Sequence, residues 1–193
     1  MTNPNIAWID VETNGVDAAT DVLLEIACLI TDSELNILDE KGFSACIYYS
    51  PEEVSRILRH TSEYVVNMHN QTNLWNRVST EGVSLRVLES SLLAYMTKYI
   101  PEPNTARLAG NSITLDRNFV NKFLPAVGNH LSYRSYDVST LAGLANNWYG
   151  PEVAYKKKTL HSAFSDINES IEELKFLRTH IFKTPEEFAA LSK

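Results

Sequence analysis

The sequence predicts an α/β domain built around a mixed β-sheet. Three apolar, strand-like regions joined by short turns open the chain, which indicates an antiparallel meander. After residue 50, short strands alternate with amphipathic helices, a pattern that adds the later strands to the sheet in parallel. The 193 residues, 44% of them hydrophobic, are enough for one domain with a sizeable core.

The predicted meander has two long strands and a third arm in two pieces, at 6–12, 23–31, 35–39 and 43–49. Residues that favour turns, chiefly Asp, Ser and Gly, separate these stretches at 32–34 and 41–42. The alternation of apolar stretches and turns therefore predicts three neighbouring antiparallel strands.

A helical pattern begins at Pro51, because Ser50 is a good N-cap and proline is favoured in the first turn. Apolar residues recur every three or four positions from Leu85 to Tyr99, which predicts an amphipathic helix ended by Pro101. The remaining predicted elements are strands at 107–110 and 133–138 and helices near 115–124, 139–148 and 162–180. We expect one domain over 1–182 and a short C-terminal extension, 183–193, that is either helical or disordered.

Composition excludes several classes of protein. The net charge of −7 argues against a protein that coats long nucleic acid, but not against an enzyme that uses metal ions to bind a short nucleotide. No stretch approaches the roughly 18 apolar residues of a membrane span, and no signal peptide is visible, so we expect a cytoplasmic protein. Cys28 and Cys46 form no metal-binding spacing, and we expect them to be free core thiols.

The most informative motif is the acid pair Asp10 and Glu12 at the end of the first strand. Residues two apart in a strand point to the same face, so both carboxylates are directed at one place. Close carboxylates beside a buried strand need positive charge between them, and a hard divalent cation would supply it. The alternative is a strand end with two solvated acids before a turn.

Two later segments carry further candidate ligands. Asp116 follows a strand that ends at Gly110, and Asp166 lies in the first turns of the last long helix, five residues after His161. The simpler explanations are a helix-dipole contact for Asp116 and an N-terminal cap with a surface histidine for the other pair.

The order of these residues resembles the DEDDh exonucleases. Several segments are similar to oligoribonuclease in particular, among them 8–12, 31–37, 110–112, 137–141 and 161–163. The resemblance implies a ribonuclease H-like fold, with a mixed five-stranded sheet (an antiparallel meander, then parallel strands) flanked by helices, and identifies residues 1–182 as an exonuclease domain.

The resemblance also implies an activity. The chain would be a 3′–5′ exoribonuclease that degrades short oligoribonucleotides, with short DNA left open, to nucleoside 5′-monophosphates. Two Mg²⁺ or Mn²⁺ ions would be held by four acids, with His161 as general base: Asp10, Glu12, Asp116 and Asp166.

The substrate contacts and assembly are likewise carried over from the family. The resemblance implies a homodimer in which Tyr133 and Arg134 of one subunit help to close the site of the other. The residues that would contact substrate are Ser112, Tyr133, Arg134, Ser139, Thr140, His69 and Tyr64.

The chain departs from the family at Thr13, Asn14 and Ser165, which bears on substrate contacts more than on chemistry. One alternative is a related exonuclease that acts on longer RNA ends or single-stranded DNA. A catalytically inactive binding module is the other, and it ranks lower because all five catalytic positions are filled.

Overall fold

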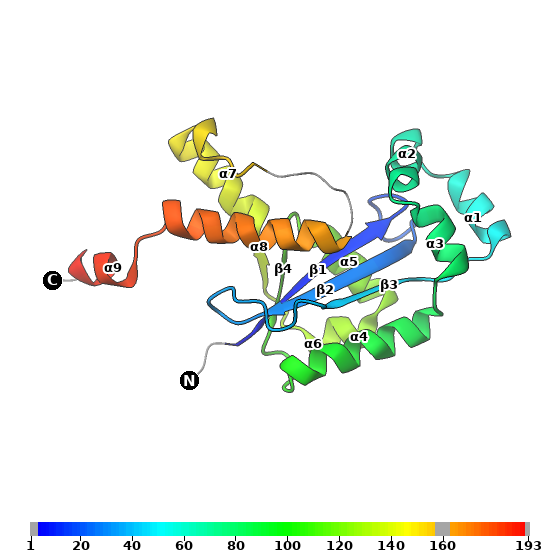
Figure 1. The fold of residues 1–193 in the computed structure, drawn as a ribbon, viewed down its shortest axis with the longest axis horizontal. Helices are drawn as coiled ribbons and strands as arrows, with labels where there is room; N and C mark the ends of the chain where they lie inside the picture. Colours follow the sequence, from blue (N-terminus) through cyan, green and yellow to red (C-terminus); the bar gives the residue numbers. More distant parts are fainter. Residues whose placement is uncertain (1–3, 157–162, 192–193) are drawn as a thin grey trace.

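The computed structural model describes residues 4–156 and 163–191, and its centre is a five-stranded sheet with the order β3-β2-β1-β4-β5 (Figure 1). The strands are β1 Ile6–Thr13, β2 Leu23–Thr31, β3 Phe43–Cys46, β4 Arg107–Gly110 and β5 Ser135–Asp137. β1 pairs antiparallel with β2 and β2 with β3, whereas β4 runs parallel to β1 and β5 parallel to β4. The predicted mixed sheet, a meander followed by parallel strands, is confirmed.

Helices follow the strands in the predicted order. They are α1 Pro51–Leu58, α2 Glu63–Gln71, α3 Leu74–Thr80, α4 Leu85–Tyr99, α5 Thr114–Phe123, α6 Pro125–His130, α7 Val138–Tyr149, α8 Ala163–His180 and α9 Pro185–Leu191, with a short 3₁₀ turn at Pro151–Val153. Helix α9 shows that the C-terminal extension includes a helix, and none of its residues is buried.

Side-chain alternation along β1 assigns the two faces of the sheet. Ala7, Ile9 and Val11 pack in the core under α4, α5 and α6, whereas Ile6 and Trp8 pack under α7 and α8. In Figure 1, α8 crosses the sheet on the second of these sides. Because the period is two residues, the side chains that follow Trp8 on the α8 face are the acids Asp10 and Glu12.

The predicted strand at 35–39 is wrong. Leu35 has a positive φ of 69°, and the Asp32 carboxylate accepts hydrogen bonds from the backbone N–H groups of Glu34 and Asn36. This local turn replaces strand pairing, and only Ile37 meets Thr31, in an isolated bridge. Leu35 and Ile37 pack in the core from this turn. Their alternating spacing is the same as that of a strand, so periodicity alone predicts a strand here.

Two other predicted strands are shorter than expected. The third strand ends at Cys46; Ile47 still donates to the Leu24 carbonyl of β2 and also forms an isolated bridge with Val83. β5 covers only Ser135–Asp137, so Tyr133 lies outside the sheet.

A buried ion pair supports the strand opposite the acid motif. Glu25 of β2 is 5% exposed and lies directly across from Glu12 in the β1–β2 register. Arg77 of α3 binds it with both terminal nitrogens, at 2.5 and 3.2 Å. The guanidinium therefore neutralises a buried carboxylate next to the candidate site.

Both cysteines are buried free thiols, as expected.

Within the described ranges, no helix is both long enough and apolar enough to cross a membrane.

Removing one partner of the buried pair should destabilise the fold. We expect Arg77→Met to lower the free energy of unfolding by about 3 kcal/mol, since Glu25 would keep its buried charge without a counter-charge. Chemical denaturation measures this change, with Arg86→Met on exposed α4 surface as the matched control. Equal stability of the two variants would show that the pair contributes nothing.

Candidate metal-binding active site

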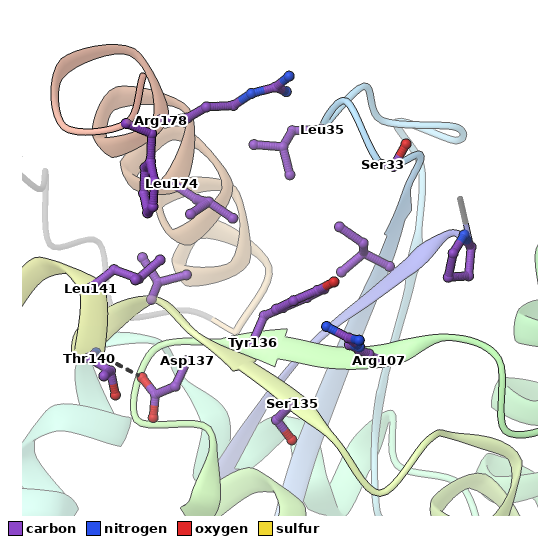
Figure 2. A pocket seen from close by; sticks show the side chains of 14 residues that line it. Ser33, Leu35, Arg107, Ser135, Tyr136, Asp137, Thr140, Leu141, Leu174 and Arg178 are labelled. Atoms are coloured by element: carbon purple, nitrogen blue, oxygen red, sulfur yellow. Dashed lines mark hydrogen bonds between the residues drawn. The ribbon is translucent and has the colours of Figure 1, made fainter. Parts of the chain in front are cut away.

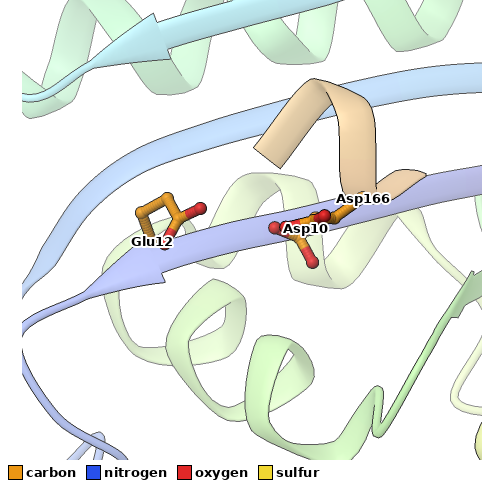
Figure 3. Close-up of side chains that lie close together, drawn as sticks. All are labelled: Asp10, Glu12 and Asp166. Atoms are coloured by element: carbon orange, nitrogen blue, oxygen red, sulfur yellow. The ribbon is translucent and has the colours of Figure 1, made fainter. Parts of the chain in front are cut away.

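Three carboxylates meet on the α8 face of the sheet. One oxygen from each of Asp10, Glu12 and Asp166 lies within 4.8 Å of the others. Asp10 and Glu12 come from β1 and Asp166 from the first turn of α8, more than 150 residues later in the chain. Figure 3 shows Asp166 of α8 beside Asp10, with Glu12 two residues further along the strand.

Packing between α8 and the sheet holds this cluster together. Ile167 and Ile171 are 2% and 0% exposed and pack with Trp8 in the core beneath the helix. The Trp8 indole also donates to the Thr31 hydroxyl at 3.0 Å, which fixes the ring between the strand and the helix. The start of α8 is therefore positioned over the end of β1 by apolar contacts.

Asp116 lies beside the cluster and has a structural contact of its own. It is 5% exposed in the first turn of α5, and its carboxylate accepts a 3.0 Å hydrogen bond from the Val11 backbone N–H. β1 pairs with β4 only as far as Trp8, so Asp116 replaces a strand partner where β4 leaves β1. It is absent from the three-carboxylate cluster, but it is near enough for its charge to act on Asp10.

Burial and mutual repulsion raise the pKa values of these acids. The pKa of Asp10 is well above its ordinary value, because of burial first and then the charges of Asp116, Glu12 and Asp166. Burial, with the charges of Asp166 and Glu25, raises the pKa of Glu12 to about 8. Burial raises the pKa of Asp116 to about 7, against the opposing effect of the Val11 hydrogen bond.

The donor set fits a divalent cation. Carboxylate oxygens are the ligands that hard cations such as Mg²⁺ and Mn²⁺ prefer. In the described part of the chain, no lysine or arginine lies within ion-pair distance of Asp10 or Glu12. A cation would supply the missing positive charge and allow these buried acids to ionise.

His69 is buried next to Glu12, at the end of β1. It is 1% exposed, its Nε2–H donates to the Thr13 carbonyl at 2.8 Å, and its Nδ1 is 3.8 Å from Glu12. The ring also packs edge-on against Trp75. Burial lowers the pKa of His69, so the ring is held neutral. In this position it supports the end of β1 and does not reach solvent.

Hydroxyl groups gather at the start of α7. The backbone N–H of Ser112 donates to Ser139 Oγ at 3.0 Å and to the Asp137 carboxylate at 3.2 Å. Asp137 also caps α7 by accepting from the Thr140 N–H. Three of the predicted substrate residues, Ser112, Ser139 and Thr140, are therefore brought together by the fold.

The other predicted substrate residues are dispersed. Tyr133 and Arg134 are exposed and contact each other, with Arg134 Nε 3.0 Å from the Tyr133 hydroxyl. Tyr64 is 73% exposed on α2. His161 lies outside the residues that the structure describes.

Several positioning residues were not predicted from the sequence. The Asn111 amide donates to Ser170 at 2.8 Å and to Glu173 at 3.0 Å, while its oxygen accepts from Ser139 at 2.9 Å. This network ties α8 to the start of α7. Asn14 is also buried and accepts from the Val22 N–H, so this departure from the family pattern has a structural contact. A single sequence offers no periodic signal for either asparagine.

Comparison with known proteins agrees with this geometry. The family model RNase_T, described as Exonuclease, matches residues 7–174. A protein named oligoribonuclease from Pseudomonas syringae pv. tomato is 40% identical over 179 residues, covering 93% of this chain and 97% of that protein. The oligoribonuclease from Mycobacterium leprae is 38% identical, and the match covers 93% of this chain and 82% of that protein. The one from Pseudomonas aeruginosa PAO1 is 39% identical, and the match covers 95% of this chain and 99% of that protein.

The fold is also similar to solved structures. The zinc-bound complex of Escherichia coli exonuclease I with single-stranded DNA superposes with a TM-score of 0.67 at 16% identity. The match covers 98% of this chain but only 43% of the exonuclease I chain. At this identity the likeness establishes a shared fold.

The raised pKa values predict how stability changes with pH. Glu12 and Asp116 have pKa values of about 8 and 7 in the fold, against ordinary values of 4.5 and 3.8. Their protonated forms therefore stabilise the metal-free fold at acid pH, and this stability is lost as the pH rises through 7 to 8. In EDTA, the melting temperature should fall between about pH 5 and about pH 8, and Mg²⁺ or Mn²⁺ should reduce that fall.

Glu12→Gln isolates this effect, because it removes one titrating group and one ligand at nearly constant volume. Its melting temperature should fall less with pH than that of the unmodified protein, whereas exposed Glu52→Gln should change nothing. Identical pH profiles for the protein and for Glu12→Gln would contradict the assignment of a raised pKa.

Proposed function

The chain belongs to the oligoribonuclease family of exonucleases, and we propose that its acid cluster hydrolyses short RNA with Mg²⁺ or Mn²⁺ as the cofactor. The fold is ribonuclease H-like, and the activity is that of a 3′–5′ exoribonuclease. The observation that carries the proposal is the meeting of Asp10, Glu12 and Asp166 within 4.8 Å, in a chain 40% identical to oligoribonuclease over 93% of its length.

Asp10, Glu12 and Asp166, with Asp116 beside them, would hold two cations, which supply Lewis-acid charge that activates a water and offsets the negative phosphate. The half-buried positions of Asp10 and Glu12 limit the screening of their interactions by bulk water. Asp10 is central to the group, because the charges of all three other acids act on it.

His161 would act as the general base. An unperturbed imidazole titrates near pH 6.5, so it can take the proton from the attacking water close to neutral pH. Water attacks the phosphorus of the 3′-terminal phosphodiester, and the bond to the O3′ of the preceding nucleotide breaks. The product is a nucleoside 5′-monophosphate, and the shortened RNA keeps a 3′ hydroxyl.

The hydroxyls of Ser112, Ser139 and Thr140 suit the 5′ phosphate of a very short substrate. They lie together at the start of α7, where Ser112 and Ser139 are in hydrogen-bonding contact. Tyr133 and Arg134 project from the subunit, so in a homodimer they would reach the partner's site. An arginine suits this role because guanidinium binds phosphate with paired hydrogen bonds. Tyr64 would stack on a base, and His69 would act through Glu12 and Thr13.

We further assign residues 1–182 to the exonuclease domain and the cytoplasm as its location. The supporting observation for the domain is the family match over 7–174.

Substrate length tests the proposed function. We expect rapid release of mononucleotides from 5′-labelled RNA of two and five nucleotides, and slow release from one of twenty. The reason is that the hydroxyls of Ser112, Ser139 and Thr140 would bind the 5′ end of a short substrate and leave no room for a long one. Asp10→Asn should lower turnover more than about 100-fold, since even residues around metal ligands are worth about 10- to 100-fold. Equal rates on all three lengths would identify a general exonuclease, and no product from any would indicate a binding module.

His161→Ala tests the assignment of the base. Turnover should fall by about 100-fold or more, while binding of Mn²⁺ stays unchanged because the acids are intact. His60→Ala, an exposed histidine on the surface, is the matched control. Full turnover in His161→Ala would remove the residue from the mechanism.

A further inference from the structure

A cavity lies on the same face of the sheet as the acids, at the opposite end of α8. Its volume is about 760 Å³, within the range of small-molecule sites. It is enclosed by the start of β1, the loop after β2, strand β5 and helices α7 and α8 (Figure 2). None of the three clustered carboxylates lines it, but Thr140, one of the predicted substrate residues, does.

Distance along α8 separates the cavity from the catalytic acids. Arg178 and Leu174 line the cavity near the C-terminal end of the helix, whereas Asp166 lies in its first turn. At 1.5 Å per residue, the twelve positions from Asp166 to Arg178 span about 18 Å. A small molecule in the cavity would therefore not touch the acid cluster.

Arg107 gives the cavity a positive charge. Its guanidinium carbon is 4.6 Å from the centre of the Tyr136 ring, which lies across the cavity in Figure 2. Stacking on a ring leaves the N–H edge of a guanidinium available, with its five donors. Over the ranges that the structure describes, Arg107 has no acid within ion-pair distance.

The other charged groups of the cavity have partners. Arg178 is paired with Glu34 at 2.5 Å. The Asp137 carboxylate accepts hydrogen bonds from the N–H groups of Ser112 and Thr140. Arg107 is therefore the charged group of this cavity that is available to pair with an anionic ligand. Such a positive group is notable in a protein with a net charge of −7.

The remaining walls are suited to an organic group. Apolar side chains from three elements and two loops line the space, namely Ile6, Leu35, Leu141, Leu174 and Phe182. Hydroxyls of Ser33 and Ser135 add hydrogen-bonding groups at its edge. Tyr136, 39% exposed, offers an aromatic surface next to Arg107. Aromatic stacking beside a guanidinium is a common way to bind a base and its phosphate.

We propose that this cavity is a binding site for a nucleoside 5′-monophosphate, with the phosphate on Arg107 and the base among Tyr136 and the apolar walls. The proposal concerns binding alone and does not rest on the proposed hydrolysis. It assigns the molecule a nucleotide site that is separate from the acid cluster.

Calorimetric titration of 5′-AMP in EDTA tests the proposal. Without cations the acid cluster offers a phosphate no positive charge, so binding there is suppressed and the distal cavity is measured. We expect one 5′-AMP per chain, retained by Asp10→Asn. Arg107→Gln should weaken binding at least about tenfold, the effect of losing a charged hydrogen bond, while exposed Arg86→Gln should not change it.

Two further measurements guard against a folding defect and against a general affinity for anions. Tyr136→Leu keeps the apolar volume but removes the stacking ring, and it should also weaken 5′-AMP binding; circular dichroism checks the fold of each variant. Adenosine and inorganic phosphate should each bind at least about tenfold more weakly than 5′-AMP. The proposal is overturned if 5′-AMP does not bind, if Arg107→Gln binds normally, or if Asp10→Asn abolishes binding.

Discussion

Repulsion among three half-buried carboxylates is the constraint around which this molecule is organised. Asp10, Glu12 and Asp166 converge within 4.8 Å, and burial raises the pKa values of the first two. Such a cluster opposes folding unless packing elsewhere holds it together. The apolar contacts of Ile167 and Ile171 with the sheet provide that force, and a bound cation would relieve the repulsion. The folded protein therefore has a site, at Asp10 and Glu12, where the described residues supply no lysine or arginine as a counter-charge.

The residues around the acid cluster fix its geometry. Arg77 forms its ion pair with Glu25 opposite the acids and not with Glu12, so this arginine does not replace the cation that the cluster would bind. His69 is held neutral and fixes the Thr13 carbonyl just beyond Glu12. Asn111 links α8 to the hydroxyls at the start of α7. One arrangement therefore sets the metal ligands and the predicted phosphate contacts together.

Much of this was predictable, because local rules govern it. Strand alternation places Asp10 and Glu12 on one face, and the order of strands and helices predicts the mixed sheet. The strand predicted at 35–39 failed because the Asp32 side chain forms a turn that apolar periodicity does not reveal. The burial of His69 and the network of Asn111 depend on contacts between residues far apart in the chain, which no local pattern encodes.

The number of Mn²⁺ ions bound tests the central claim most directly, and electron paramagnetic resonance can count them in the purified protein. If the acids form a cation site that drives hydrolysis, the protein binds two Mn²⁺ ions in the presence of a non-hydrolysable dinucleotide, and Asp10→Asn loses them. If Asp10→Asn binds Mn²⁺ as well as the unmodified protein does, the acid cluster is not the metal site and the account is wrong.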